Sequence, residues 1–196
     1  MSIEEEIKEH KKIYTQMAKT RPEFSYRTLL WSSLEAQQKR FEQMKNLCLF
    51  KNKKILDVGC GVGDFLKYLQ NNSLEVNYTG VDIIEEFIKE ASYRHPEAKF
   101  LLQNILEPAF SSVYDIVVAS GIFSFSSREF IEKMILKMFS IAKECICFNI
   151  FLGKDDEGFT DVTKRDLLDL FFNRGLEKFY IVEDYDPHDI TILIHK

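Results

Sequence analysis

The stretch Lys54-Ile-Leu-Asp-Val-Gly-Cys-Gly-Val-Gly-Asp64 decides the fold of this chain. It opens with a short apolar run that stops at Gly59, and helical apolar spacing (Phe65, Leu66, Leu69) begins just past Gly63. This pattern predicts a strand, a tight glycine turn and a helix. The three glycines permit positive φ and carry no Cβ, so a ligand can lie against backbone amides at the helix N-terminus.

The residues around the glycines indicate which ligand fits. A dinucleotide loop spaces its glycines G-x-G-x-x-G and binds a pyrophosphate. Here the spacing is G-x-G-x-G, Asp64 stands where the last dinucleotide glycine would fall, and Asp57 lies two residues before the first glycine. Two carboxylates would repel a pyrophosphate but suit a ligand that presents cations. S-adenosylmethionine carries a sulfonium and an ammonium and has no phosphate.

Two further segments follow the glycine loop along the chain, Tyr78-Thr-Gly-Val-Asp-Ile83 and Tyr114-Asp-Ile-Val-Val-Ala-Ser-Gly121. With the glycine loop they make the chain resemble the class I S-adenosylmethionine-dependent methyltransferases from about residue 53 to the end. The resemblance implies an α/β, Rossmann-like, doubly wound seven-stranded sheet of order 3-2-1-4-5-7-6 with an antiparallel last strand and N-terminal helices. It also implies an enzyme that uses S-adenosyl-L-methionine and releases S-adenosyl-L-homocysteine.

Length and composition limit the possibilities further. A chain of 196 residues holds one sizeable core, so we expect residues 1–50 to form a helical cap within the same domain as a methyltransferase domain at 51–196. The net charge of -5 argues against nucleic acid. A charged N-terminus and the absence of a long apolar run predict a cytoplasmic protein without a membrane partner. The four cysteines are expected to be reduced thiols, and no metal site is expected.

The cofactor residues follow from the loop and from the resemblance. Asp82 ends the second predicted strand, where it can accept both ribose hydroxyls; its alternative role is to cap the following helix. The resemblance implies an acidic contact to the adenine amino group, but Asn104 stands at that place. It also implies that Arg40 or Arg27 holds the methionine carboxylate, although either could form a structural ion pair. The expected set is Asp57, Gly59, Cys60, Gly61, Asp64, Asp82, Ile83, Asn104, Ile105, Ser120 and Arg40.

The acceptor side is expected after the fourth strand, at Ser120 to Phe123. This place lacks the Asn/Asp-Pro-Pro-Tyr/Phe signature of many amide and base methyltransferases, which argues against those acceptors. Substrate walls are expected at Trp31, Phe123 and Phe151. Late in the chain, the titratable residues Tyr185, His188 and Asp189 lie close together in sequence and are the candidate catalytic residues. The pKa of a histidine lies in the range that suits a general base. Alternatively, these residues are present only because Asp, Pro and His are common in turns.

The leading hypothesis is methyl transfer to oxygen or nitrogen of a small molecule by a monomer or weak homodimer. The alternatives are a protein or peptide acceptor, a non-catalytic S-adenosylmethionine-binding or scaffold protein, and a more distant nicotinamide oxidoreductase. An amphipathic helix from Ser2 to about Lys19 is either a packing helix or a lid over the cofactor. The charged segment 153–161 has glycines near both ends and is a candidate flap.

Overall fold

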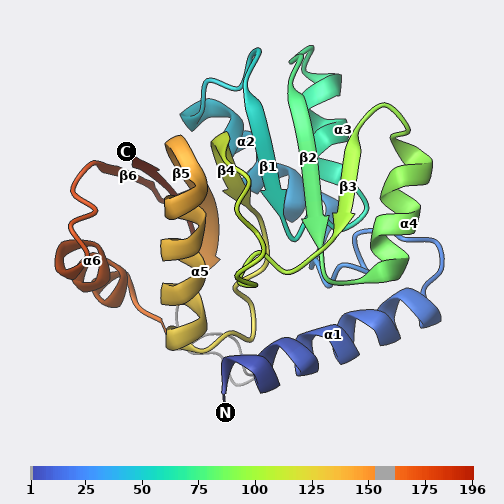
Figure 1. Cartoon of the computed structure of the whole chain (residues 1–196), viewed down its shortest axis with the longest axis horizontal. Helices are drawn as coiled ribbons and strands as arrows, with labels where there is room; N and C mark the ends of the chain where they lie inside the picture. The colour runs from blue at the N-terminus through green and yellow to red at the C-terminus, as the bar shows by residue number, and fades with distance from the viewer. Residues whose placement is uncertain (1, 153–161) are drawn as a thin grey trace.

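The computed structural model describes residues 2–152 and 162–196, which form one twisted sheet covered by helices (Figure 1). The sheet order is β3-β2-β1-β4-β5-β7-β6, with β7 antiparallel to both of its neighbours. The predicted strand order and antiparallel last strand are therefore confirmed. The strands are β1 (Lys54–Val58), β2 (Asn77–Asp82), β3 (Lys99–Leu102), β4 (Tyr114–Ala119), β5 (Ala142–Phe151), β6 (Phe179–Val182) and β7 (Asp189–His195).

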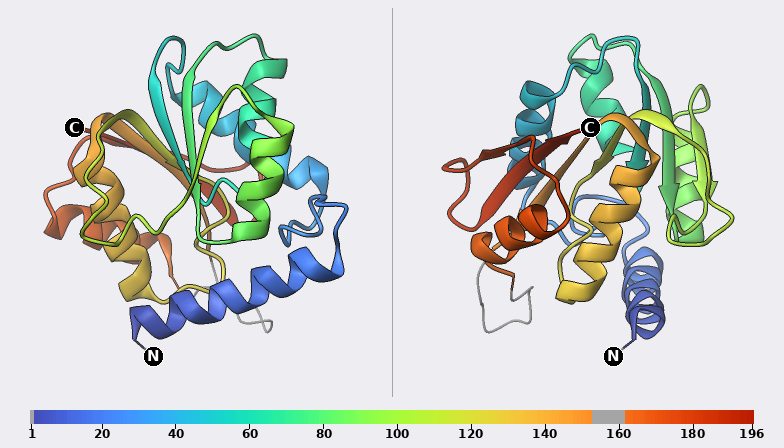
Figure 2. Two further views of the ribbon diagram at one scale, coloured as in Figure 1. Left: turned by 45° about the vertical axis from the view of Figure 1, so that its right-hand side comes forward. Right: turned by 60° about the vertical axis from the view of Figure 1, so that its left-hand side comes forward.

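Helices cover both faces of the sheet because successive strand residues point to opposite sides. Ile55, Ile116 and Val118 pack in one core cluster with residues of α2 and α3, whereas Leu56 and Val117 pack in another with residues of α5 and α6. Figure 2 shows these two helix layers on opposite sides of the sheet. The helices are α1 (Ile3–Thr20), α2 (Leu34–Leu47), α3 (Asp64–Asn71), α4 (Glu85–Arg94), α5 (Arg128–Ile141) and α6 (Lys164–Asn173).

Most helix starts follow the capping signals in the sequence. Ser2 and Thr163 each complete a capping box, and Ser127 caps α5. Ser33 caps α2, because its hydroxyl accepts the Ala36 backbone N–H at 3.0 Å. The helix ends at Leu47, and the backbone N–H of Cys48 donates to the carbonyl of Met44.

The first helix runs across the carboxyl ends of the parallel strands (Figures 1 and 2). The buried Glu6 carboxylate ties it to the start of α5 by accepting the Ser127 backbone N–H at 2.8 Å and its hydroxyl at 2.6 Å. Farther along α1, the ring of Tyr14 packs edge-on against Phe87 of α4. The helix therefore bridges α4 and α5 over the strand ends.

Some sequence predictions concern features that the structure describes only in part. The candidate flap at 153–161 lies outside the described residues. Within the described ranges, no helix is long and apolar enough to cross a bilayer. The same residues contain no group of three or more His, Cys, Asp or Glu side chains that could hold a metal ion.

Candidate functional site

The loop after β1 is held open by backbone geometry. Gly59, Gly61 and Gly63 all have positive φ, at 69°, 52° and 86°. The backbone N–H groups of Gly59 and Cys60 both donate to the carbonyl of Val81, which fastens the loop to the end of β2. A Cβ on Gly59 would lie 2.2 Å from a methyl carbon of Ile122, so glycine keeps the β1 and β4 ends close together.

A cavity of about 140 Å³ opens between this loop, the strand ends and α1. Every residue expected to bind the cofactor lines it except Arg40. These residues are Asp57, Gly59, Cys60, Gly61, Asp64, Asp82, Ile83, Asn104, Ile105 and Ser120. The fold thus gathers the end of β1, the end of β2 and the two segments after β3 and β4 around one space, as a doubly wound sheet does at its switch point.

Two of the carboxylates in this cavity are buried and form no ion pair with a described residue. Asp57 is 3% exposed and accepts the Tyr78 hydroxyl proton at 2.5 Å, and burial raises its pKa to about 7. Asp82 accepts the backbone N–H groups of Gly61 at 3.0 Å and Ile84 at 2.9 Å, and burial raises its pKa to about 6. Burial without a cation makes the ionised form of both groups costly.

The third carboxylate, Asp64, has a different environment. Gln37 of α2 donates its amide N–H to Asp64 at 3.1 Å, and a guanidinium nitrogen of Arg94 lies 3.7 Å from the other oxygen. The negative charge of Asp64 is therefore balanced within the chain. From the sequence, Asp57 and Asp64 were expected to be the carboxylates that face the cofactor cations. In the structure, Asp57 and Asp82 are the buried carboxylates without an ion-pair partner among the described residues.

Asp82 and Asn104 keep acceptor capacity toward the cavity. Each Asp82 oxygen accepts one backbone N–H and retains a second lone pair for a hydroxyl. The bond to Ile84 shows that Asp82 also supports the turn into α4, so its two predicted roles are compatible. The side-chain oxygen of Asn104 accepts the Leu106 N–H at 3.0 Å and likewise has a lone pair left.

Sequence reasoning missed the residues that close the cavity from the N-terminal segment. His10 and Tyr14 of α1, Leu29 of the connector and Gln37 of α2 all line it. Burial raises the pKa of Tyr14 to about 12, with the nearby Asp82 charge adding to the effect. The helical spacing of His10 and Tyr14 in the sequence predicts that both lie on the buried face of the helix. It does not decide whether that face packs on the core or covers the cofactor. In the structure, α1 packs against α4 and α5 and also covers the first cavity.

A second cavity, of about 120 Å³, adjoins the first across Trp31 and Gly121, which line both. Gly121 has φ 78°, and a Cβ there would lie 2.7 Å from the Trp31 ring. Only glycine therefore lets the indole approach the loop after β4 so closely. The predicted substrate residues Phe123 and Phe151 line this second cavity together with Trp31.

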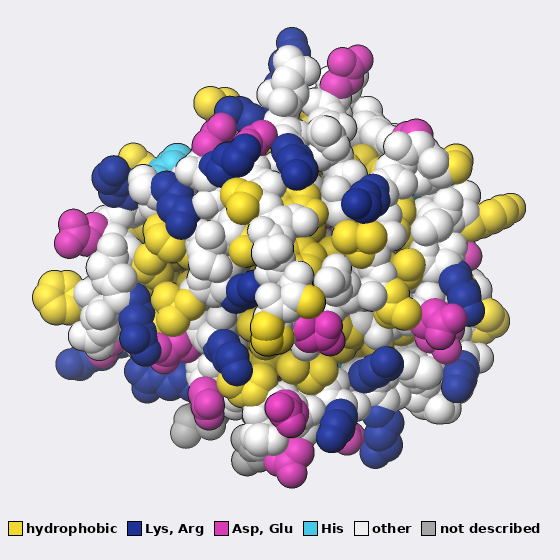
Figure 3. Space-filling view, viewed as in Figure 1, with side chains coloured by type: hydrophobic (Ala, Val, Ile, Leu, Met, Phe, Trp, Pro, Cys, Tyr) yellow, Lys and Arg dark blue, Asp and Glu magenta, His cyan; other side chains and the backbone are white. Residues whose placement is uncertain are grey.

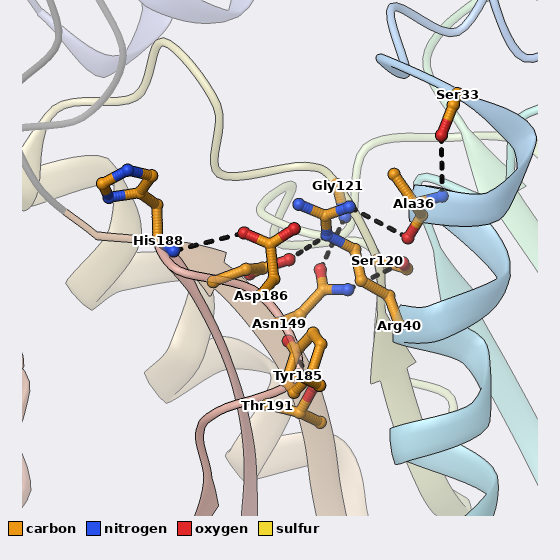
Figure 4. A network of polar contacts seen from close by, with 11 residues as sticks. Ser33, Ala36, Arg40, Ser120, Gly121, Asn149, Tyr185, Asp186, His188 and Thr191 are labelled. Atoms are coloured by element: carbon orange, nitrogen blue, oxygen red, sulfur yellow. Dashed lines mark hydrogen bonds and ion pairs between the residues drawn. The ribbon is translucent and has the colours of Figure 1, made fainter.

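Asn149, near the end of β5, holds the loop between the two cavities. Its side-chain oxygen accepts the Gly121 N–H at 3.0 Å, and its amide nitrogen donates to the Ser120 hydroxyl at 3.1 Å (Figure 4). The side chain is 2% exposed and also lines the second cavity. This polar residue in an aromatic strand is therefore satisfied by the loop that it positions.

Arg40 lies at the second cavity and not at the first, which differs from its predicted place beside the cofactor. Its guanidinium forms an ion pair with Asp189, donates to the Ala36 carbonyl at 3.0 Å and lies over the Trp31 ring at 5.0 Å. The two charged side chains are only 11% and 1% exposed. Its observed partners match the ion-pair alternative that the sequence left open.

Tyr185 lies close enough to Asp189 that the Asp189 charge adds to burial in raising the pKa of Tyr185, but the imidazole of His188 does not join them. The Tyr185 hydroxyl is 2.8 Å from that of Thr191, and Figure 4 shows the imidazole of His188 directed away from Arg40. His188 is exposed, and its ring lies 5.5 Å from that of Phe151. Of the three, Asp189 alone lines either of the cavities described above. His188, the residue before it, points the other way, as neighbouring residues entering a strand do.

Comparisons with known proteins agree with this architecture. Residues 55–144 match a family model described as a methyltransferase domain. A relative in Mycobacterium tuberculosis H37Rv, named "Putative methyltransferase Rv1506c", is 27% identical over 156 residues, covering 72% of this chain and 92% of that protein.

Solved structures share the fold at low sequence identity. Magnesium protoporphyrin IX methyltransferase from Synechocystis PCC 6803, with bound S-adenosylhomocysteine, aligns with a TM-score of 0.69 at 14% identity, covering 95% of this chain and 99% of that one. The DhpI–S-adenosylhomocysteine complex aligns with a TM-score of 0.67 at 14% identity, covering 94% and 97%. The matched methyltransferase domain, the relative and the confirmed strand order support an S-adenosylmethionine-dependent methyltransferase and agree with the resemblance to the class I family.

Proposed function

We propose that the chain transfers a methyl group from S-adenosylmethionine, bound in the first cavity, to oxygen or nitrogen of a small molecule bound in the second. One observation carries the proposal: the two cavities adjoin, because Trp31 and Gly121 line both of them. A donor in the first cavity and an acceptor in the second would lie beside each other at this shared boundary. Holding two reactants at near-attack distance is the main contribution a protein makes to such a displacement.

The residues of the first cavity suit the cofactor. Asp57 and Asp82 are buried carboxylates that form no ion pair with a described residue. The sulfonium or the ammonium of the cofactor would offset their negative charge. Asp82 has lone pairs for ribose hydroxyls, and Asn104 has one for the adenine amino group. When bound, S-adenosylmethionine supplies an already activated methyl group. The chain's own task is to orient it and to exclude water.

The second cavity favours a small acceptor. Its volume is about 120 Å³, and three aromatic side chains, Trp31, Phe123 and Phe151, form part of its lining. Phe123 is fully buried, so this wall belongs to the core and is fixed in place. A protein acceptor would instead require an open groove. Figure 3 shows acidic and basic side chains mixed over one face, and the net charge of -5 disfavours nucleic acid.

We further propose that residues 1–50 are a cap within the same domain as residues 51–196. In support, Phe41 and Met44 of α2 belong to the same core cluster as Phe65 and Leu69 of α3. A cap that shares a core with the sheet folds together with it.

The four free, buried cysteines accord with a cytoplasmic, reducing compartment, and a monomer or weak homodimer stays our expectation.

Radiolabelled S-adenosylmethionine tests the acceptor class. The protein is incubated with a small-molecule extract and, separately, with a protein fraction, and the label is followed in each. We expect label in the small-molecule extract. Label confined to proteins would support a protein acceptor instead, and binding of the cofactor without transfer to either would support a non-catalytic role. A Phe151→Ala variant, which alters the second cavity alone, should lower transfer without changing cofactor affinity.

A further inference from the structure

The second cavity contains a buried ion pair beside three aromatic rings and the uncharged polar residues Ser32, Ser124 and Asn149. Arg40 and Asp189 contact each other there, with side chains 11% and 1% exposed. They come from α2 and from the first residue of β7, and the Trp31 ring covers the guanidinium at 5.0 Å. An ion pair this deep is costly to remove from water, and an all-apolar cavity would serve an apolar ligand at least as well. The pair therefore points to a polar group on the ligand.

The charges of the pair already cancel, which restricts the ligand. A carboxylate would compete with Asp189 for Arg40, and an ammonium would compete with Arg40 for Asp189. Either exchange would leave one buried charge without its partner, at an energetic cost that is large in a poorly solvated cavity. A hydroxyl group both donates and accepts a hydrogen bond, so it can meet the carboxylate and the guanidinium at once without adding charge.

The walls of the cavity indicate the rest of the ligand. Trp31, Phe123 and Phe151 present flat apolar surfaces, and aromatic rings pack well against one another in offset or edge-on arrangements. Asn149 connects this space to Ser120 of the first cavity through a 3.1 Å hydrogen bond. A planar ring with one hydroxyl would therefore fill the apolar part and direct its oxygen to the polar part.

We propose that the acceptor is an uncharged aromatic hydroxyl compound and that Asp189 is its general base, with Arg40 holding the developing oxyanion. The inference rests on the methyltransferase function proposed above. The hydroxyl proton passes to the Asp189 carboxylate, and the oxygen forms a bond to the methyl carbon as the carbon–sulfur bond breaks and its electron pair stays on sulfur. A cationic donor, a neutral acceptor and a carboxylate thus give a methyl ether, a neutral thioether and a carboxylic acid.

The surroundings of Asp189 agree with this role. Burial raises the pKa of Asp189 to about 7, against the opposing effect of Arg40, so its carboxylate is a stronger base than an exposed aspartate. His188 and Tyr185, the other candidates in this segment, line neither described cavity. Within this segment, Asp189 is therefore the titratable group best placed to touch an acceptor.

Binding of three single-ring probes tests the class of acceptor without any substitution. Phenol, benzoate and benzylamine are titrated into the protein saturated with S-adenosylhomocysteine, and affinities are measured by ligand-observed NMR. We expect phenol to bind at least tenfold more tightly than either charged probe. Equal or tighter binding of benzoate or benzylamine, or binding of none of the three, would overturn the inference.

A second experiment tests Asp189 itself. Asp189→Asn preserves shape, and we expect it to lower transfer at least 100-fold while cofactor affinity changes less than twofold. The matched control is Asp184→Asn, an exposed carboxylate in the same connection, which should change neither. Full transfer by Asp189→Asn would refute the base assignment. Label found on amines or carboxylates of an extract would refute this inference alone, whereas label on no small molecule would refute the proposed function as well.

Discussion

Replacing Asp57 by asparagine should make the ligand-free protein more stable and the cofactor complex weaker. Asp57 is 3% exposed, its hydrogen-bond partner is the Tyr78 hydroxyl at 2.5 Å, and it forms no ion pair with a described residue. Asparagine has nearly the same shape, and its side-chain oxygen can keep the bond to Tyr78. The change therefore removes a buried charge and little else.

The magnitude follows from the pKa. Burial raises the pKa of Asp57 from 3.8 to about 7, and at about 1.36 kcal/mol per pKa unit the ionised form is destabilised by up to about 4 kcal/mol. Because the folded protein binds this proton more tightly than the unfolded chain, the native state loses stability as pH rises from about 4 to about 7. The stability advantage of the variant should thus be near zero at pH 4 and largest above pH 7.

Urea unfolding at several pH values measures this difference, and calorimetric titration with S-adenosylhomocysteine measures the cost in binding. We expect Asp57→Asn to be more stable than the unaltered protein at pH 8. We also expect it to bind S-adenosylhomocysteine at least tenfold more weakly, because the ammonium of the ligand no longer faces a buried anion. The exposed control Asp184→Asn should change neither quantity. A variant that is no more stable at pH 8, or that keeps full affinity, would refute the electrostatic reasoning.

Three other substitutions test the cap, the wall and the hairpin. Gly121→Ala would place a Cβ 2.7 Å from the Trp31 ring at a φ of 78°, so transfer should be abolished and thermal unfolding should show a loss of about 1–2 kcal/mol. Glu6→Gln weakens the charge-assisted hydrogen bonds to Ser127, so we expect the free energy of unfolding to fall by about 1.5–3 kcal/mol. We also expect faster release of S-adenosylhomocysteine in stopped-flow measurements. An unchanged release rate would argue against a covering role for α1. His188→Ala should retain full turnover because the side chain is exposed and lines neither cavity, and a large loss would return it to the catalytic candidates.

The sheet and the cofactor side of the site were predictable because they depend on local patterns. The glycine loop, the strand that ends at Asp82 and the buried strand before Ser120 each carry their own signal, and a doubly wound sheet brings such strand ends together. The place of Asn104 at the cofactor came from the family resemblance, and Asn104 lines the first cavity. None of these inferences required knowing which distant side chains touch.

The acceptor side depended on contacts between distant segments, which periodicity cannot reveal. An ion pair was one of the two roles expected for Arg40, but its pairing with Asp189 depends on the packing of α2 beside β7. The charge of Asp64 is balanced by Arg94 from α4, which altered the electrostatic argument. Conversely, Tyr185 and His188 are close to Asp189 in sequence but line neither of the described cavities.

The most direct test of the account is a calorimetric comparison of S-adenosylmethionine with NADH. The buried carboxylates Asp57 and Asp82 should accept a cationic nucleoside and reject a diphosphate at the same glycine loop. We predict tight, saturable binding of S-adenosylmethionine and no detectable heat from NADH. Tight binding of NADH with no response to S-adenosylmethionine would contradict the account.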